Sequence, residues 1–193
     1  KKAPLFFATP SLAMQPIFDK MNSAEIENFS IVLKVLNTLN ELSLVAFNET
    51  KIASLATLKL PGRYESFLFK KKIIFLDVAH NHISYLRLIE KIKKIYPSQK
   101  IAIAFNSSRD KDIKKMGELI KQNFNEIYIL PVPGNNRIFN PVELSEILNT
   151  GKTFSELKIG IESILKNSPA EVIIFTGSFY LIGEVGRFFN RHA

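Results

Sequence analysis

The first well-patterned segment of the chain has apolar residues at helical spacing. Between Ser23 and about Leu42 these residues recur at every third or fourth position, at Ile26, Phe29, Val32, Leu33, Leu36 and Leu39. A period of about 3.6 residues predicts one long amphipathic helix, and Ser23 is placed to serve as its N-cap.

Two short apolar runs follow on either side of a lysine turn. They are YESFLF, residues 64–69, and KIIFLD, residues 72–77. Their length and the short connection between them predict a β-hairpin whose first strand lies at an edge of the sheet.

Helices and strands then alternate through the rest of the sequence. Further strands are predicted at residues 100–105, 126–130 and 171–179, and helices at residues 83–96, 112–122, 140–148, 153–165 and 180–190. Asn140 as N-cap with Pro141 at the first helical position marks one helix start. A capping box from Thr153 to Glu156 marks another.

The strands from residue 72 onward are continuous apolar runs, which indicates burial on both faces. The pattern therefore predicts a doubly wound, mostly parallel α/β sheet, Rossmann-like, with an antiparallel edge hairpin and a long N-terminal helix. In such sheets ligands bind beyond the carboxyl ends of the strands. These ends hold the segments Asp77–Asn81, Asn106–Lys111 and Thr176–Ser178.

Composition removes several classes of function. The chain has no cysteine, which excludes a disulfide scaffold, a thiolate zinc site and a cysteine nucleophile. Its three histidines lack partners at metal spacing, so we expect no metal site here. The net charge of +8 comes from scattered lysines, so we expect a solvated surface that attracts small anions and no nucleic-acid partner. No run reaches the roughly 18 apolar residues of a membrane span, and we expect a cytoplasmic protein.

The candidate binding residues each have a structural alternative. The chain has neither G-x-G-x-x-G nor a G-x-x-x-x-G-K-[ST] loop. Gly177–Ser178 can form an anion cradle, or a tight turn followed by a helix cap. Asp77 can accept hydrogen bonds from a ribose diol, or it can cap a helix. His80 can hold a substrate carboxylate, or it can have a purely structural role. Arg63 can bind phosphate or be an ordinary exposed arginine.

Four segments in register decide among these readings. LPGRYE, IIFLDVAHN, SRDKD and FTGSFYLIGEV resemble, in order and spacing, the C-terminal domain of the folylpolyglutamate synthase and dihydrofolate synthase family, relatives of the Mur ligases. The resemblance covers roughly residues 22–190. The chain departs from the family pattern at His82, where proline is usual, and at Asn106, where glycine is usual; the first change leaves the helix start open.

The resemblance implies an enzyme that uses ATP and Mg²⁺ to convert a folate or dihydropteroate carboxylate into an acyl phosphate, which the amino group of L-glutamate then attacks. By position it implies a set of site residues: Asn28 at adenine, Arg63 at phosphate, Asp77 at ribose, His80 and Ser178 at glutamate, and His80 with Lys111 in catalysis. Such catalysis works by positioning and charge stabilisation.

The resemblance also implies a division of the chain. Residues 1–58 are expected to be the remnant of a central ATPase domain with a linker helix, and residues 59–193 the C-terminal glutamate-ligase domain. The family's phosphate loop, magnesium ligands and most of its folate pocket belong to an N-terminal domain. We therefore expect a fragment that is inactive alone, a partner in its own N-terminal ATPase domain, and a monomer.

Two other functions stay open. A peptidoglycan Mur-type ligase shares the architecture but acts on a nucleotide-linked muramyl substrate. A non-catalytic α/β module that binds a small anion or a protein is the alternative from another class. The sequence leaves open whether the parent enzyme adds the first glutamate, extends the glutamate tail, or does both.

Overall fold

The computed structural model describes residues 23–46 and 60–190 of the chain. The chain divides into two compact units, Lys1–Lys59 and Leu60–Ala193, which are described separately. No helix within the described residues is long and apolar enough to cross a membrane.

The first unit contains helix α2 (Ser23–Glu41), which confirms the predicted long helix. Phe29 and Leu33 are buried, while Val35 on the same helix is exposed. The side chain of Ser23 lies outside the described residues, so its role as N-cap stays a prediction.

The second unit is built on a six-stranded sheet with the order β1-β2-β6-β3-β4-β5. The strands are β1 (Glu65–Phe69), β2 (Lys72–Leu76), β3 (Ile101–Phe105), β4 (Glu126–Ile129), β5 (Lys152–Thr153) and β6 (Val172–Thr176). Only the edge pair β1–β2 is antiparallel. The predicted mostly parallel sheet with an edge hairpin is therefore confirmed, and the last strand in sequence lies between β2 and β3.

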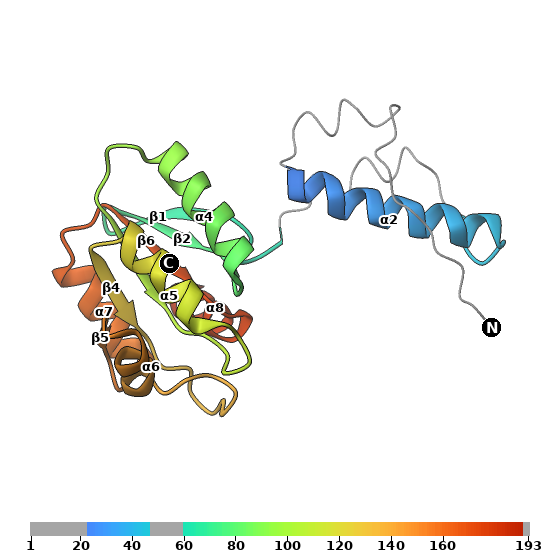
Figure 1. Ribbon diagram of the computed structural model, residues 1–193. Coiled ribbons are helices and arrows are strands. Elements are labelled where there is room, and N and C mark those ends of the chain that lie inside the picture. Colours follow the sequence, from blue (N-terminus) through green and yellow to red (C-terminus); the bar gives the residue numbers. More distant parts are fainter. Residues whose placement is uncertain (1–22, 47–59, 191–193) are drawn as a thin grey trace. The chain divides into compact units, whose positions relative to one another are not determined.

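Helices cover both faces of this sheet (Figure 1). They are α4 (His82–Ile95), α5 (Ile113–Asn123), α6 (Pro141–Leu148), α7 (Leu157–Asn167) and α8 (Phe179–Asn190). Because side chains alternate along a strand, Phe75 of β2 packs in a core with α4, α5 and α6, whereas Ile74 packs in a second core with α7 and α8. Both cores are apolar, as the continuous apolar runs predicted.

Two of the predicted helix caps can be compared with the structure, and one of them is confirmed. Asn140 caps α6 because its side-chain oxygen accepts a hydrogen bond from the backbone N–H of Val142. The predicted capping box from Thr153 to Glu156 is wrong. Thr153 belongs to β5, where it pairs with Ile129 of β4. Glu156 is the N-cap of α7 but has no side-chain cap bond.

The β1–β2 hairpin closes through an unusual two-residue turn. Phe69 pairs with Lys72, which leaves Lys70 and Lys71 as the connection. Both have positive φ, 48° and 66°, as a type I′ turn requires. Asparagine and glycine adopt this conformation at lower cost than lysine.

We expect the double substitution Lys70→Asn, Lys71→Gly to raise the free energy of unfolding by about 1–2 kcal/mol. The reason is that it removes the backbone strain of two lysines held in the left-handed conformation. Urea unfolding monitored by circular dichroism measures this change. Lys94→Gly, in the exposed face of α4, is the matched control and is expected to lose about 1 kcal/mol. A fall in stability for the double variant contradicts the turn geometry.

Candidate active site

The carboxyl ends of three adjacent parallel strands bring the candidate residues to one edge of the sheet. Asp77 follows β2, Asn106 follows β3, and Gly177 with Ser178 follows β6, which lies between the other two strands. The Thr176 hydroxyl lies 3.4 Å from the carbonyl oxygen of Ala79. The end of β6 is therefore in contact with the loop after β2.

A tight turn at residues 60–64 lies against the same edge. The N–H of Arg63 donates to the carbonyl of Leu60, and the N–H of Val78 donates to the carbonyl of Gly62 at 2.9 Å. Gly62 has φ +69°, and a Cβ there would lie 2.6 Å from a methyl carbon of Ile182 in α8. Glycine is therefore needed at this point, and the turn is held directly against the loop after β2.

Asp77 is buried, and both its carboxylate oxygens accept hydrogen bonds from backbone. Oδ2 accepts from the N–H of Tyr64 at 3.0 Å, and Oδ1 from the N–H of Ala79 at 2.8 Å. Burial raises the pKa of the carboxyl, while these hydrogen bonds and the charges of Arg63 and Lys91 oppose the rise. Asp77 thus links the turn that carries Arg63 to the loop after β2.

The raised pKa of Asp77 predicts a pH effect. Titration of its carboxyl carbon by NMR should give a midpoint above the ordinary 3.8. Since the folded-state pKa lies above the unfolded value, protonation stabilises the fold at low pH. That contribution is lost as pH rises through the folded-state pKa.

Asp110 is the matched control for this titration. A hydrogen bond from Lys111 lowers the pKa of this exposed carboxyl, so its midpoint should fall below 3.8. A midpoint for Asp77 at or below that of Asp110 would contradict the buried environment.

Arg63 and His80 gather on the ring of Phe179, the first residue of α8. The guanidinium carbon of Arg63 lies 5.4 Å from the ring centroid, and the His80 ring lies 5.7 Å from it. Phe179 itself is 57% exposed, so this surface is open to solvent. An arginine and an imidazole that share one exposed aromatic ring form a surface suited to an anion with a planar part.

The imidazole of His80 is oriented by the backbone. Nδ1 lies 2.9 Å from the carbonyl oxygen of Val78, so Nδ1 carries the proton and Nε2 can accept one. The following helix, α4, begins at His82, with Asn81 as N-cap in a capping box with Ser84. The helix start that the sequence left open is therefore fixed by Asn81.

Gly177 and Ser178 form the start of α8. Gly177 has φ +108°, and a Cβ there would lie 2.1 Å from the carbonyl oxygen of Asn106. The Ser178 hydroxyl oxygen accepts from the N–H of Leu181 at 3.1 Å, which makes it a helix cap. The tight turn and the cap are thus present, and the cap leaves the hydroxyl proton available for donation.

Lys111 and Asn28 are the other two predicted site residues. The Lys111 amine lies 2.8 Å from the carboxylate of Asp110. Asn28 is exposed on α2 in the first unit. Among the described residues of the second unit, no hydrogen bond or ion pair joins Lys111 to His80 or Ser178. Their roles stay predictions.

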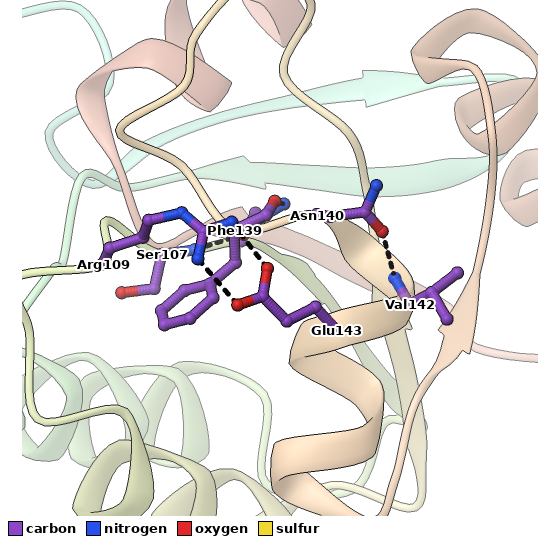
Figure 2. Close-up of polar contacts among 7 residues, drawn as sticks. Ser107, Arg109, Phe139, Asn140, Val142 and Glu143 are labelled. Carbon is purple, nitrogen blue, oxygen red and sulfur yellow. Dashed lines mark hydrogen bonds and ion pairs between the residues drawn. The ribbon is translucent and has the colours of Figure 1, made fainter.

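The loop after β3 is fixed to α6 by an arginine (Figure 2). The two Nη atoms of Arg109 donate to the two carboxylate oxygens of Glu143, at 2.7 and 2.6 Å. The guanidinium also lies 5.0 Å from the ring centroid of Phe139. Arg109 is therefore used within the domain, whereas the guanidinium of Arg63 pairs with no carboxylate among the described residues of this unit.

Two residues of this edge were not singled out for these roles by the sequence. Phe179 supplies the ring between Arg63 and His80, and the signal was an aromatic residue directly after Gly-Ser at a helix start. Asn106 was noted as the start of a strand-end segment and as a departure from a family pattern, without a structural role. Its amide donates to the carbonyls of Leu130 and Phe139 at 2.6 and 3.0 Å, so it holds two loops together.

A metal site is not found in residues 23–46 and 60–190, where no three histidine, aspartate or glutamate side chains cluster. The expectation that magnesium ligands lie in an N-terminal domain stays a prediction.

No protein-family model matches the chain. Curated proteins of similar sequence do match it. The chain is 30% identical over 131 residues to a folylpolyglutamate synthase of Lacticaseibacillus casei, covering 68% of this chain and 30% of the relative. It is 28% identical over 134 residues to a dihydrofolate synthase/folylpolyglutamate synthase of Buchnera aphidicola, covering 68% and 32%. The chain thus spans about a third of the length of these relatives.

A solved structure has the same fold. E. coli FolC in complex with DHPP and ADP matches with a TM-score of 0.68 at 22% identity, covering 84% of this chain and 38% of that one. At this identity the likeness establishes the fold. Together with the curated relatives, it agrees with the resemblance that the four sequence segments indicated.

Proposed function

Because the chain belongs to the folylpolyglutamate synthase and dihydrofolate synthase family, we propose that it is the C-terminal part of an ATP-dependent ligase. This ligase joins L-glutamate to a folate or dihydropteroate carboxylate through an acyl phosphate. The observation that carries the proposal is the meeting of Arg63 and His80 on Phe179, at the N-terminus of α8.

The division of the chain is part of the proposal. Residues 1–58 are the remnant of a central ATPase domain with its linker helix, and residues 59–193 form the glutamate-ligase domain. The N-terminal ATPase domain is the principal partner and supplies the magnesium ligands. We further propose a monomeric, cytoplasmic protein.

The residues present fit a nucleotide and an acidic amino acid. Arg63 presents an exposed guanidinium whose paired N–H groups suit phosphate oxygens. Asp77 is assigned to the ribose side of the same site and Asn28 to adenine. ATP, when bound, supplies the phosphoryl group that activates the substrate carboxylate.

The glutamate side of the site is assigned to His80 and Ser178. The first amides of α8 lack intrahelical partners, so the helix start attracts a carboxylate. The Ser178 hydroxyl can donate to the same carboxylate. Nε2 of His80 can accept a proton from the incoming ammonium group, which makes the amine nucleophilic. Lys111 is also assigned to catalysis, where its positive charge stabilises developing negative charge.

The test is an assay of ATP- and glutamate-dependent ligation with a folate acceptor. It uses the complete protein, meaning this chain joined to the proposed N-terminal ATPase domain. We expect the complete protein to release ADP and lengthen the folate by glutamate, and this chain alone to be inactive. Robust turnover by this chain alone would contradict the proposed division.

Matched arginine variants locate the site within the complete protein. Arg63→Ala should lower kcat/KM at least tenfold, since a charged hydrogen bond to phosphate is lost. Arg187→Ala removes an exposed arginine that pairs with Glu184 near the end of α8 and should leave activity unchanged. Equal effects of the two variants would argue against the site.

Two outcomes would favour the alternatives. Ligation of a UDP-muramyl substrate in preference to a folate would indicate a Mur-type ligase. Unchanged ligation after Asp77→Ala and Ser178→Ala in the complete protein would indicate a non-catalytic module at this edge.

A further inference from the structure

We propose that a cleft beside the turn of the β1–β2 hairpin binds a small, flat apolar molecule that carries an anionic group. The cleft lies between this turn and the helices α7 and α8. The turn precedes the amino end of β2, whereas the candidate active site lies beyond the carboxyl ends of the strands. The cleft is therefore separate from the candidate active site, and the proposal does not depend on the proposed function.

The cleft has the size and the lining of a small-molecule site. Its volume is about 420 Å³, within the range of roughly 300–1,000 Å³ that is usual for such sites. The hairpin and the two helices supply its lining side chains, which are Phe69, Lys70, Glu162, Leu165, Lys166 and Phe188. Half of these side chains are apolar and half are charged. Such a lining suits a ligand with an apolar body and a charged group.

The apolar floor of the cleft is built from aromatic rings that are already fixed. The ring centroids of Phe69 and Phe188 lie 5.1 and 5.3 Å from that of Phe189, and both contacts are edge-to-face. Phe189 itself is buried in the second core. A flat apolar group can therefore pack on this floor without first ordering it, which lowers the entropic cost of binding.

The charged side chains of the cleft leave an excess of positive charge. Lys70 and Lys166 are exposed, and Lys166 forms no hydrogen bond or ion pair with the described residues of this unit. The carboxylate of Glu162 lies 3.9 Å from the amine of Lys158, one turn earlier in α7, and this amine offsets its charge. An anionic group is thus the charge that complements the cleft.

The hairpin turn is strained where it supplies this positive charge. Lys70 and Lys71 both have positive φ, a conformation that in bulky residues is concentrated at functional sites. The Lys70 amine lies 5.5 Å from the centroid of the Phe69 ring, so the turn holds this amine beside the apolar floor. Lysine therefore occupies a turn position where asparagine or glycine would be less strained, and it carries a charge that faces the cleft.

Lys72, the next lysine of the hairpin, has a structural use. Its Nζ donates to the carbonyl oxygens of Ser168 and Ala170, both at 2.7 Å. Ser168 is the C-cap of α7, and a lysine at this point offsets the partial negative charge of the helix C-terminus. The end of α7 therefore does not repel an anion bound near Lys166.

The test uses two related probes in fluorescence titrations of the full chain. One is 8-anilinonaphthalene-1-sulfonate, a flat apolar anion, and the other is N-phenyl-1-naphthylamine, which lacks the sulfonate. An Arg63→Ala background removes the guanidinium that offers the same anion a place at the candidate active site. We expect the anionic probe to bind in this background and to shift the amide NMR signals of residues 69–70 and 165–166, but not those of residues 177–179.

Variants that remove charge identify the groups that hold the anion. In the same background, Lys166→Ala and the double substitution Lys70→Asn, Lys71→Gly should each raise the Kd of the anionic probe about fivefold, and that of the neutral probe less than about twofold. Lys94→Ala, on α4 at the other face of the sheet, removes the same charge and should change neither Kd. Because the hairpin variant is expected to be more stable than its parent, its weaker binding would not reflect unfolding.

Three results would overturn the proposal. They are an equal Kd of the anionic probe in all variants, NMR shifts confined to residues outside the cleft, and self-association of the chain that disappears in Lys166→Glu, which would assign the cleft to a second copy. Ligation by the complete protein tests the proposed function separately, and Lys166→Ala should leave its kcat/KM unchanged. A complete protein that binds the probe in this cleft but does not ligate glutamate would contradict the proposed function alone.

Discussion

Gly177→Ala is expected to lower the free energy of unfolding by about 4 kcal/mol. The new methyl group would lie 2.1 Å from the backbone carbonyl oxygen of Asn106, and φ is +108°. Strain at such a φ costs about 1–3 kcal/mol, and forcing a methyl group into a packed site costs a similar amount. The obstacle is backbone at the centre of the sheet, so rotation of a side chain does not relieve it.

Gly183→Ala is the matched control for this substitution. Gly183 lies within α8, and nothing stands within 4 Å of a Cβ built there. Alanine in a helix interior should therefore stabilise the protein by about 1 kcal/mol. Denaturant unfolding of both variants gives the comparison. A Gly177→Ala protein as stable as the wild type would mean that the loops after β3 and β6 do not approach as described.

Asn106→Asp is expected to lower the free energy of unfolding by about 3–5 kcal/mol at pH 7. The side-chain amide of Asn106 is fully buried and donates to the carbonyls of Leu130 and Phe139. A carboxylate of the same shape has no donor, so it would be a buried charge facing two carbonyl oxygens. Urea unfolding at pH 7 measures the loss.

The pH dependence of this variant identifies the cause. Burial raises the pKa of the new carboxyl above its unfolded value, so protonation favours the folded state. The loss should therefore shrink as pH falls below the folded-state pKa and grow as pH rises through it.

The exposed N-cap of α6 provides the control. Asn140 only accepts, from the N–H of Val142, and aspartate caps equally well, so Asn140→Asp should change stability by less than about 0.5 kcal/mol. A loss at Asn106 that does not vary with pH would contradict this account.

The elements of the fold were predicted well where a local pattern determines them. The strand at residues 72–76 and the helix at Pro141 follow from apolar runs and cap chemistry that can be seen in a few neighbouring residues. Strand β5 was missed because two residues carry no period, and Thr153 there had the composition of a helix cap. The order of strands depends on packing between segments far apart in sequence, and no local pattern encodes it.

The candidate site shows the same limit. The rule that parallel strands end at one edge correctly brought Asp77, His80 and Ser178 to that edge. The hydrogen bonds that Asp77 makes could not be foreseen, because one donor lies thirteen residues away and depends on the left-handed backbone of Tyr64. The position of Phe179 between Arg63 and His80 likewise follows from the approach of two loops and a helix.

The central place of β6 bears on how this unit is made in the cell. Residues 172–176 form the last of the six strands to leave the ribosome, yet this strand lies between β2 and β3 in the sheet. Until they emerge, both neighbours have open edges and cannot pair correctly. The nascent unit therefore has to wait, exposed to proteases and chaperones, for a segment near its end before its sheet can close.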